Sequence, residues 1–157
     1  MLNATTLTAT SEADGLWCTK ADNLTPGVST AACVPVLLAD AAGTVVAAVH
    51  SGCRSTVAGI AGAAVAALAV DPATLVAAIG PCIELAKFEV GSEVAEQFDA
   101  AFVDTSSYAK PHIDLVAVVT EQLRAAGVPG ENIERVGACT HAHADRYFSY
   151  RRDGKGT

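Results

Sequence analysis

Apolar stretches in this chain of 157 residues are mostly short, and residues such as Gly, Pro, Asn and Asp separate them. A short apolar run that ends at such residues is typical of a β-strand. Residues 44–50 are rich in valine, which favours a buried strand. The predicted strands are residues 13–19, 28–39, 44–50, 74–79, 133–140 and 146–151, with a turn at 22–27.

Helices are predicted in three longer segments. Residues 54–70 are rich in Ala and Gly, which allow close packing, and Pro72 follows the end of that helix. Residues 92–102 place apolar side chains at helical spacing. Asp114 is the predicted N-cap of a third helix, which ends before Gly127.

The order of these elements predicts the fold class. Because helices and strands alternate only in part, we expect an α+β fold, a mixed α-β sandwich, rather than a doubly wound parallel sheet. The length fits a single domain. We assign this domain to residues 13–157, and we expect residues 1–12 to form a loose N-terminal arm.

Composition argues against several functions. The longest apolar run, residues 57–70, is shorter than the roughly 20 residues that span a membrane. The net charge of −7 argues against nucleic acid as a partner, because nucleic-acid binding needs a basic face. Residues 1–12 lack the basic and apolar regions of a signal peptide, so we expect a cytoplasmic protein that binds no membrane.

The cysteines fit the same compartment. Their odd number and the absence of C-x-x-C spacing argue against a disulfide framework, and free thiols are typical of a reducing environment. The five cysteines are Cys18, Cys33, Cys53, Cys82 and Cys139.

Cys33 and His50 are the strongest candidates for chemistry. Cys33 lies in one predicted strand and His50 ends the next, so a hairpin with its turn at residues 40–43 would bring their side chains together. A thiolate beside an imidazole suits a transition-metal site or a catalytic Cys/His pair. Each residue also has an ordinary interpretation, as a small buried apolar side chain and as a structural histidine.

The strand, turn and helix around His50 also predict an anion site. Backbone N–H groups at the start of a helix point toward a bound anion, and Gly52 stands at this start. Arg54 adds a fixed positive charge that suits a phosphate or a carboxylate.

Two further clusters lie toward the end of the chain. If the strand continues, Cys139, His141 and His143 share one face and could bind a metal. If the strand ends near Thr140, they belong to a loop with two solvated histidines, which is the interpretation that we favour. Aromatic residues surround Arg151, which suits either the wall of a site for an anionic ligand or an edge strand with a basic tail.

Several motifs follow one another in a fixed order along the chain. They are Ala13-Asp-Gly-Leu, Cys33-Val-Pro-Val-Leu-Leu-Ala-Asp, Ala47-Ala-Val-His-Ser-Gly-Cys-Arg54, Ala78-Ile-Gly-Pro81, Phe88-Glu-Val-Gly91, Gly137-Ala-Cys-Thr140 and Phe148-Ser-Tyr-Arg-Arg-Asp153. In this order they resemble the YfiH-like family, which is named the polyphenol oxidoreductase laccase family and is also assigned purine nucleoside phosphorylase activity. The resemblance covers residues 14–152.

This resemblance implies an α-β sandwich of the cysteine-hydrolase type, similar to toxin deamidases that use a Cys/His pair. It implies a site in which Cys33, His50 and a histidine of an upstream Gln-Val-His-Gly segment bind zinc, or copper in the laccase reports. The implied activities are phosphorolysis of adenosine, inosine and methylthioadenosine, deamination of adenosine, and oxidation of phenols.

The chain departs from the family pattern at several points. The N-terminal part with the upstream histidine has no counterpart here. Two protein ligands hold zinc weakly, because structural sites use four and catalytic sites normally three. His141 and His143 are the candidates to supply a third ligand. The substituted positions are Ala32 for Asp, Cys53 for Trp, Ser55 for Gly, His141 for Tyr and Ala142 for Cys.

We therefore expect a metal-dependent purine nucleoside phosphorylase whose partners are a nucleoside and phosphate. Cys33, His50 and Arg54 are the expected catalytic residues, and the first two would bind zinc or, alternatively, copper. Gly52, Arg54 and Arg151 are expected to bind the phosphate. Two alternatives stay open, a copper-dependent polyphenol oxidase and a non-catalytic binding or structural paralogue. One Cys with one or two His falls short of the several copper sites that an oxidase of this kind requires.

Overall fold

The computed structural model describes residues 1–8 and 11–154 and contains one sheet of six strands. The strand order is β1-β2-β4-β3-β5-β8, in which β1 and β8 pair in parallel with their neighbours and the other pairs are antiparallel. A second, two-stranded sheet is formed by β6 and β7. The strands are β1 Leu2–Asn3, β2 Gly15–Thr19, β3 Val34–Asp40, β4 Val45–Ser51, β5 Leu75–Ile79, β6 Val103–Asp104, β7 His112–Ile113 and β8 Ile133–Arg135.

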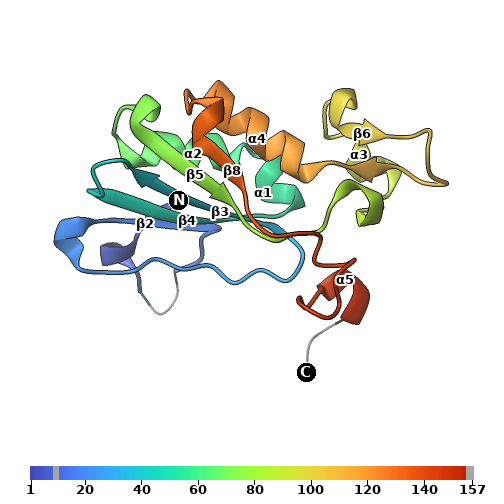
Figure 1. Ribbon diagram of the computed structural model, residues 1–157, viewed down its shortest axis with the longest axis horizontal. Helices are drawn as coiled ribbons and strands as arrows, with labels where there is room; N and C mark the ends of the chain where they lie inside the picture. Colours follow the sequence, from blue (N-terminus) through green and yellow to red (C-terminus); the bar gives the residue numbers. More distant parts are fainter. Residues whose placement is uncertain (9–10, 155–157) are drawn as a thin grey trace.

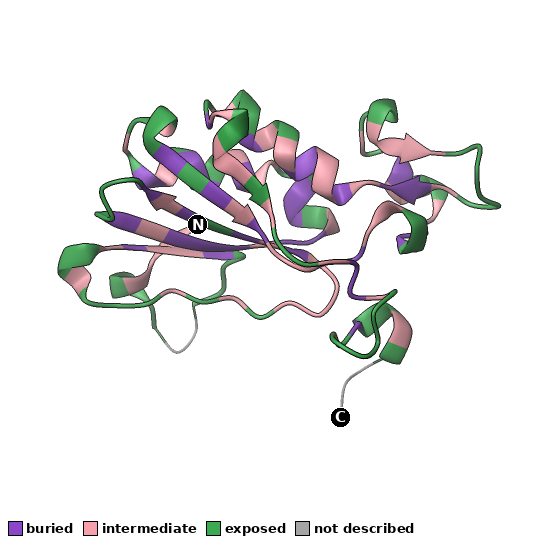
Figure 2. Cartoon of the chain, in the orientation of Figure 1, coloured by how far each residue is buried: buried purple, intermediate pink, exposed green. Residues whose placement is uncertain are grey.

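Helices α2 and α4 lie on one side of the six-stranded sheet (Figure 1). Apolar side chains such as Val49, Val65 and Val119 fill the layer between them and are almost fully buried (Figure 2). None of the helices in the described part of the chain is long and apolar enough to cross a membrane. The helices are α1 Cys53–Val57, α2 Ile60–Leu68, α3 Ser92–Ala95, α4 Leu115–Ala125 and α5 Tyr150–Asp153.

The β3–β4 hairpin is fixed by its turn. The Asp40 carboxylate accepts hydrogen bonds from the backbone N–H of Thr44 and of Val45, at 2.6 and 2.8 Å. Gly43 adopts a φ of +65°, which a glycine takes without strain. Because the turn fixes the register, residues of β3 face defined residues of β4, and Pro35 lies opposite His50.

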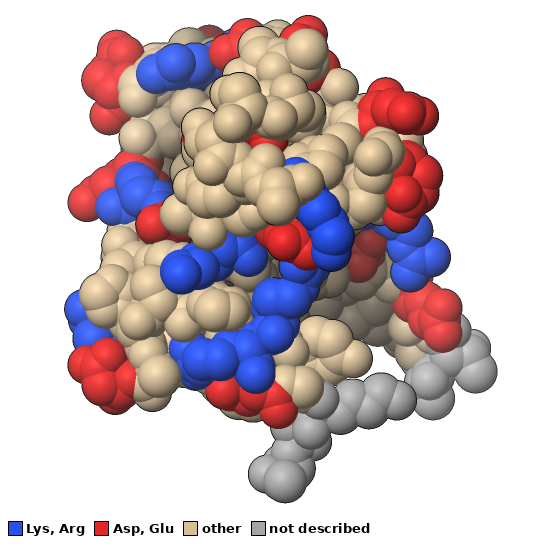
Figure 3. Space-filling view, turned by 90° about the vertical axis from the view of Figure 1, so that its right-hand side faces the viewer, with Lys and Arg blue, Asp and Glu red and all other residues tan. Residues whose placement is uncertain are grey.

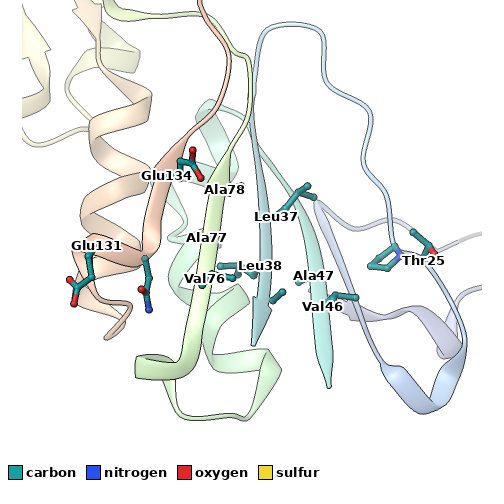
Figure 4. A pocket seen from close by; sticks show the side chains of 13 residues that line it. Thr25, Leu37, Leu38, Val46, Ala47, Val76, Ala77, Ala78, Glu131 and Glu134 are labelled. Atoms are coloured by element: carbon teal, nitrogen blue, oxygen red, sulfur yellow. The ribbon is translucent and has the colours of Figure 1, made fainter. Parts of the chain in front are cut away.

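The other side of the sheet is partly open and apolar. Leu37 of β3 is 54% exposed and Val76 of β5 is 45% exposed. They line a cavity of about 530 Å³ that extends from Thr25 and Pro26 to the edge of the sheet at Glu134 (Figure 4). An apolar face of a sheet is usually covered by another layer of protein.

The predicted mixed α-β architecture is confirmed, and the N-cap at Asp114 is confirmed by a 2.9 Å hydrogen bond from the Ala117 backbone N–H. The described part of the predicted arm, residues 1–12, contains β1, and residues 9–10 lie outside the described residues.

Several predicted boundaries are wrong. The helix predicted over residues 54–70 consists of α1 and α2, which Gly59 separates with a φ of +76°. The strand predicted over residues 28–39 begins only at Val34. The helix predicted over residues 92–102 is reduced to α3 and a 3-10 turn at its far end.

The last two predicted strands also differ. β8 ends at Arg135, although the prediction extended it to residue 140. The alternating pattern of residues 146–151 predicts a strand, but these residues contain turns and the start of α5. The alternation of aromatic and polar residues in this segment therefore does not correspond to the two faces of a sheet.

Candidate functional site

The β3–β4 hairpin brings Cys33 and His50 to one end of the sheet. Cys33 directly precedes β3, and His50 is the last residue but one of β4. In the antiparallel register Val34 lies opposite Ser51, so Cys33 reaches the point at which the chain leaves β4. The structure thus brings together the two residues that the sequence singled out, and their catalytic role stays a prediction.

Gly52 marks the point on which the two side chains converge. A Cβ atom on Gly52 would lie 3.3 Å from Cys33 Sγ, 3.3 Å from His50 Cε1 and 3.7 Å from His50 Nε2. The φ of Gly52 is −84°, which is open to any residue. The missing side chain therefore matters for the space that it leaves between the thiol and the imidazole.

Asp14 contacts the opposite edge of the His50 ring. Its Oδ1 lies 3.0 Å from His50 Nδ1, and its backbone oxygen accepts a 2.7 Å hydrogen bond from the His50 backbone N–H. In the sequence, Asp14 is part of the Ala13-Asp-Gly-Leu motif, which by itself assigns it no role. The available signal was an acidic residue directly before a strand that can pair with the histidine-bearing strand.

A second thiol and a positive charge lie near Cys33. Burial raises the pKa of the Cys33 thiol, and the Asp14 charge raises it further, whereas the Arg151 guanidinium lowers it. Burial likewise raises the pKa of the Cys53 thiol. The neighbouring Cys33 raises this pKa further, and the positive charge of Arg151 lowers it. The positive charge of Arg151 thus acts on both thiols.

Arg151 is held in this region by α5 and its neighbours. Its Nη1 donates a 2.6 Å hydrogen bond to the Glu89 backbone oxygen, and its Cζ lies 5.1 Å from the centre of the Phe88 ring. The backbone N–H of Tyr150 donates to Ala31 O at 2.7 Å, which fastens α5 close to Cys33. Figure 3 shows that Lys and Arg side chains gather on this side of a molecule whose net charge is −7.

The start of α1 suits an anion less well than the sequence suggested. α1 contains only five residues, and the Gly52 backbone N–H already donates to Ser55 Oγ at 3.0 Å. Arg54 projects from α1 as an exposed residue. The charged groups that shift the pKa of Cys33 are Asp14 and Arg151.

The cluster at residues 139–143 is a loop rather than an extended strand. The His143 backbone N–H donates back to Cys139 O at 3.2 Å, and the chain turns between them. Cys139 is buried, and its backbone forms an isolated parallel β-bridge with the backbone of Cys82. Both thiols are free. His141 and His143 are at least partly exposed, as the favoured interpretation of this cluster predicted.

A complete metal site is not present among the described residues. Residues 1–8 and 11–154 contain no group of three or more His, Cys, Asp or Glu side chains that could hold a metal ion. Cys33 and His50 supply two donors, whereas catalytic zinc sites normally use three protein ligands. Recruitment of His141 or His143 as the third ligand does not occur in this arrangement.

Comparison with known proteins places this chain in a family. A family model described as multi-copper polyphenol oxidoreductase laccase matches residues 1–157. A purine nucleoside phosphorylase of Bacteroides thetaiotaomicron is 41% identical over 138 residues, which are 81% of this chain and 51% of that protein. Adenosine deaminase RL5, from an unknown prokaryotic organism, is 40% identical over 146 residues, which are 87% of this chain and 56% of that protein.

Solved structures share the fold. The crystal structure of a Neisseria meningitidis protein superposes with a TM-score of 0.82 at 33% identity, covering 98% of this chain and 66% of the other. The chain spans about half the length of the curated relatives it matches.

Proposed function

Because the chain belongs to the multi-copper polyphenol oxidoreductase laccase family, we propose that it is an enzyme of purine nucleoside metabolism that catalyses phosphorolysis. The names of its relatives, a purine nucleoside phosphorylase and an adenosine deaminase, support this substrate class. The observation that carries the proposal is the convergence of the Cys33 thiol and the His50 imidazole at Gly52, where the charge of Arg151 lowers the pKa of Cys33.

Phosphorolysis transfers a ribosyl group from a purine to phosphate. An oxygen of phosphate forms a bond to C1′ while the bond between C1′ and N9 breaks. The base leaves with the bonding electron pair and takes up a proton. The protein must therefore hold a phosphate and supply a proton to the departing base.

The residues of the site suit these two tasks. The guanidinium of Arg151 has the geometry that binds phosphate oxygens in pairs. His50 is the proposed proton donor, because its Nε2 edge faces the open space at Gly52. Burial raises the pKa of Cys33, so we propose that, while no metal is bound, it stays a neutral thiol that borders the bound nucleoside. Arg54 would add a second positive charge at the exposed side of this space.

Zinc, or copper, enters the proposal only as an ion that Cys33 and His50 would bind. Cys33 and His50 would be its ligands, and the metal would supply a Lewis acid when bound. The described residues do not fit a complete site, because no third side chain joins these two. The steps above therefore use only the residues of this chain. The kinship to cysteine hydrolases that the resemblance implies would rest on the same Cys/His pair.

Oxidation of phenols ranks below phosphorolysis. Reduction of oxygen by four electrons needs several copper ions at defined positions, each held by several donors. The part of the chain that the structure describes contains no side-chain group of that size.

An assay of products tests the proposal. The protein is incubated with inosine and phosphate, and with adenosine alone, and the products are separated by chromatography. We expect hypoxanthine and ribose 1-phosphate from the first mixture. Inosine and ammonia from adenosine alone, without phosphorolysis, would replace the proposal by deamination. No product from either mixture would favour the non-catalytic interpretation.

Variants connect the activity to the site. His50→Gln should lower kcat by about 10²–10⁴-fold, the range that a general acid contributes. Arg151→Ala should raise the KM for phosphate more than the KM for inosine. Arg146→Ala is the matched control, because Arg146 lies over the Tyr147 ring and belongs to no part of the proposed site. Equal effects of the two arginine variants would contradict the role of Arg151.

A further inference from the structure

We propose that Phe88 is a positioning residue for phosphate, because its ring holds the Arg151 guanidinium with one donor edge open to the anion. This inference rests on the function proposed above and deepens it, since it assigns a support to the side chain that would bind phosphate. It is carried by the fixed geometry of the segment around Phe88, by the contacts of Arg151, and by the lack of a carboxylate paired with Arg151 among the described residues.

The segment that carries Phe88 is fixed by the strand beside it. Glu89 forms an isolated antiparallel bridge with β7. On either side of this bridge, the Ile113 backbone N–H donates to Phe88 O at 3.2 Å, and the Val90 backbone N–H donates to Pro111 O at 2.9 Å. Backbone groups of an extended segment alternate in direction, so the carbonyl of Glu89 points away from β7.

Arg151 contacts this fixed segment with one face and one nitrogen. Its Cζ lies 5.1 Å from the centre of the Phe88 ring, and its Nη1 donates to the Glu89 backbone oxygen at 2.6 Å. Phe88 is only 8% exposed, so its ring is anchored in the core, whereas Arg151 is an exposed residue of α5. The ring therefore restricts a long side chain that would otherwise adopt many rotamers.

The other edge of the guanidinium, formed by Nε and Nη2, is open. Within residues 1–8 and 11–154, neither nitrogen donates to an acceptor, and no carboxylate forms an ion pair with Arg151. The Glu89 carboxylate is engaged by Lys110 Nζ at 2.7 Å instead. The N–H groups of Nε and Nη2 point in parallel, which is the geometry that binds two oxygens of one phosphate.

The neighbouring Arg152 shows the contrasting case of an arginine that serves the fold. Its Nη1 donates to the backbone oxygens of Thr140 and His141, each at 2.8 Å. Its Nε and Nη2 donate to the Asp153 carboxylate at 2.8 and 2.7 Å. All three nitrogens of Arg152 are thus engaged, whereas Arg151 keeps two of its three for a ligand.

Binding of inorganic phosphate, followed by ³¹P NMR without nucleoside, tests the proposal. Phe88→Leu removes the ring, and we expect the Kd for phosphate to rise about three- to fivefold, as for loss of a cation–π contact near the surface. Phe88→Tyr keeps the ring and should bind phosphate as tightly as the parent protein. Phe98→Leu is the matched control and should also keep the parent Kd, because Phe98 packs against the core and no described arginine lies over its ring.

A double-mutant cycle separates positioning from a general effect on the fold. Arg151→Ala should weaken phosphate binding about tenfold, because a charge-assisted contact is lost. Adding Phe88→Leu to it should change the Kd little further, since the ring then has no guanidinium to hold. An equal effect of Phe88→Leu in both backgrounds would overturn the inference. Phe88→Met, a second variant without a ring, gives the same comparison if the leucine variant does not fold.

Turnover provides the second readout. Phe88→Leu should raise the KM for phosphate about three- to fivefold and leave the KM for inosine nearly unchanged. An unchanged Kd for phosphate in Phe88→Leu, or no phosphate binding by the parent protein, would overturn the inference. A parent protein that binds phosphate but does not turn over inosine would contradict the proposed function alone, and the double-mutant cycle would still decide the role of Phe88.

Discussion

At the scale of single residues, the candidate site depends on an absent side chain as much as on those present. Gly52 leaves room where a thiol and an imidazole approach each other, because Cys33 Sγ and His50 Cε1 each lie 3.3 Å from the position of a Cβ atom. A methyl group there would be closer than most side chains tolerate, although a small shift of Cys33 could accommodate it. The glycine therefore contributes little to folding and much to access.

Gly52→Ala should separate these two contributions. The methyl group would occupy the space that a substrate needs, so kcat/KM should fall by about 100-fold. The free energy of unfolding should decrease by only about 1 kcal/mol, as for a mild excess of packing. Gly27→Ala is the control, because a Cβ atom on Gly27 would have no neighbour within 4 Å. Similar activity of the two variants would show that the Gly52 space is not used.

The sequence predicted part of this site for a clear reason. The pairing of Cys33 with His50 follows from a short hairpin, because its register is local. The contact of Asp14 with His50 and the proximity of Arg151 depend on chain segments that are far apart in sequence. Alternating residues around Arg151 also resemble a strand, so their pattern concealed the turn that leads into α5.

At the scale of elements, the first helical segment is divided by one backbone conformation. Gly59 has a φ of +76° and a ψ of +33°, and it stands between α1 and α2. Hydrophobic periodicity continues through this point, because Ala and Val occur on both sides. The pattern therefore predicted one helix, since periodicity does not distinguish a glycine inside a helix from a glycine that ends one.

Two substitutions of glycine by alanine test this division. Gly59→Ala should lower the free energy of unfolding by about 1–2 kcal/mol, because a side chain is strained in the left-handed region. Gly62→Ala, inside α2, should raise it by up to about 1 kcal/mol, because alanine favours the helix and the nearest atom lies at 4.0 Å. Both values come from urea unfolding, and stabilisation by Gly59→Ala would show that α1 and α2 can join.

At the scale of the whole molecule, the sheet has one covered and one partly open face. α2 and α4 cover the first, whereas Leu37 and Val76 lie exposed on the second. The chain matches only about half the length of its curated relatives. Large exposed apolar patches on proteins are typically contact sites.

Substitutions on the open face should change dye binding, whereas a substitution on the covered face should change stability. Leu37→Thr combined with Val76→Thr should reduce the fluorescence of a bound hydrophobic dye, while the free energy of unfolding changes by less than about 1 kcal/mol. Val36→Thr is the control on the covered face, where Val36 is fully buried. It should cost about 1–3 kcal/mol and leave dye binding unchanged. Undiminished dye binding in the double variant would locate the accessible apolar surface elsewhere.

The attachment of α5 gives the two halves of the site unequal local stability. Cys33 and His50 belong to the central hairpin, whereas Arg151 lies on a helix of four residues. The guanidinium of Arg152 fastens that helix by donating to the carbonyls of Thr140 and His141. A segment held by a few peripheral hydrogen bonds opens far more often than a central strand, and its amide protons exchange sooner with solvent. The helix that carries Arg151 would therefore open transiently while the sheet remains folded. A bound anion would slow this local opening.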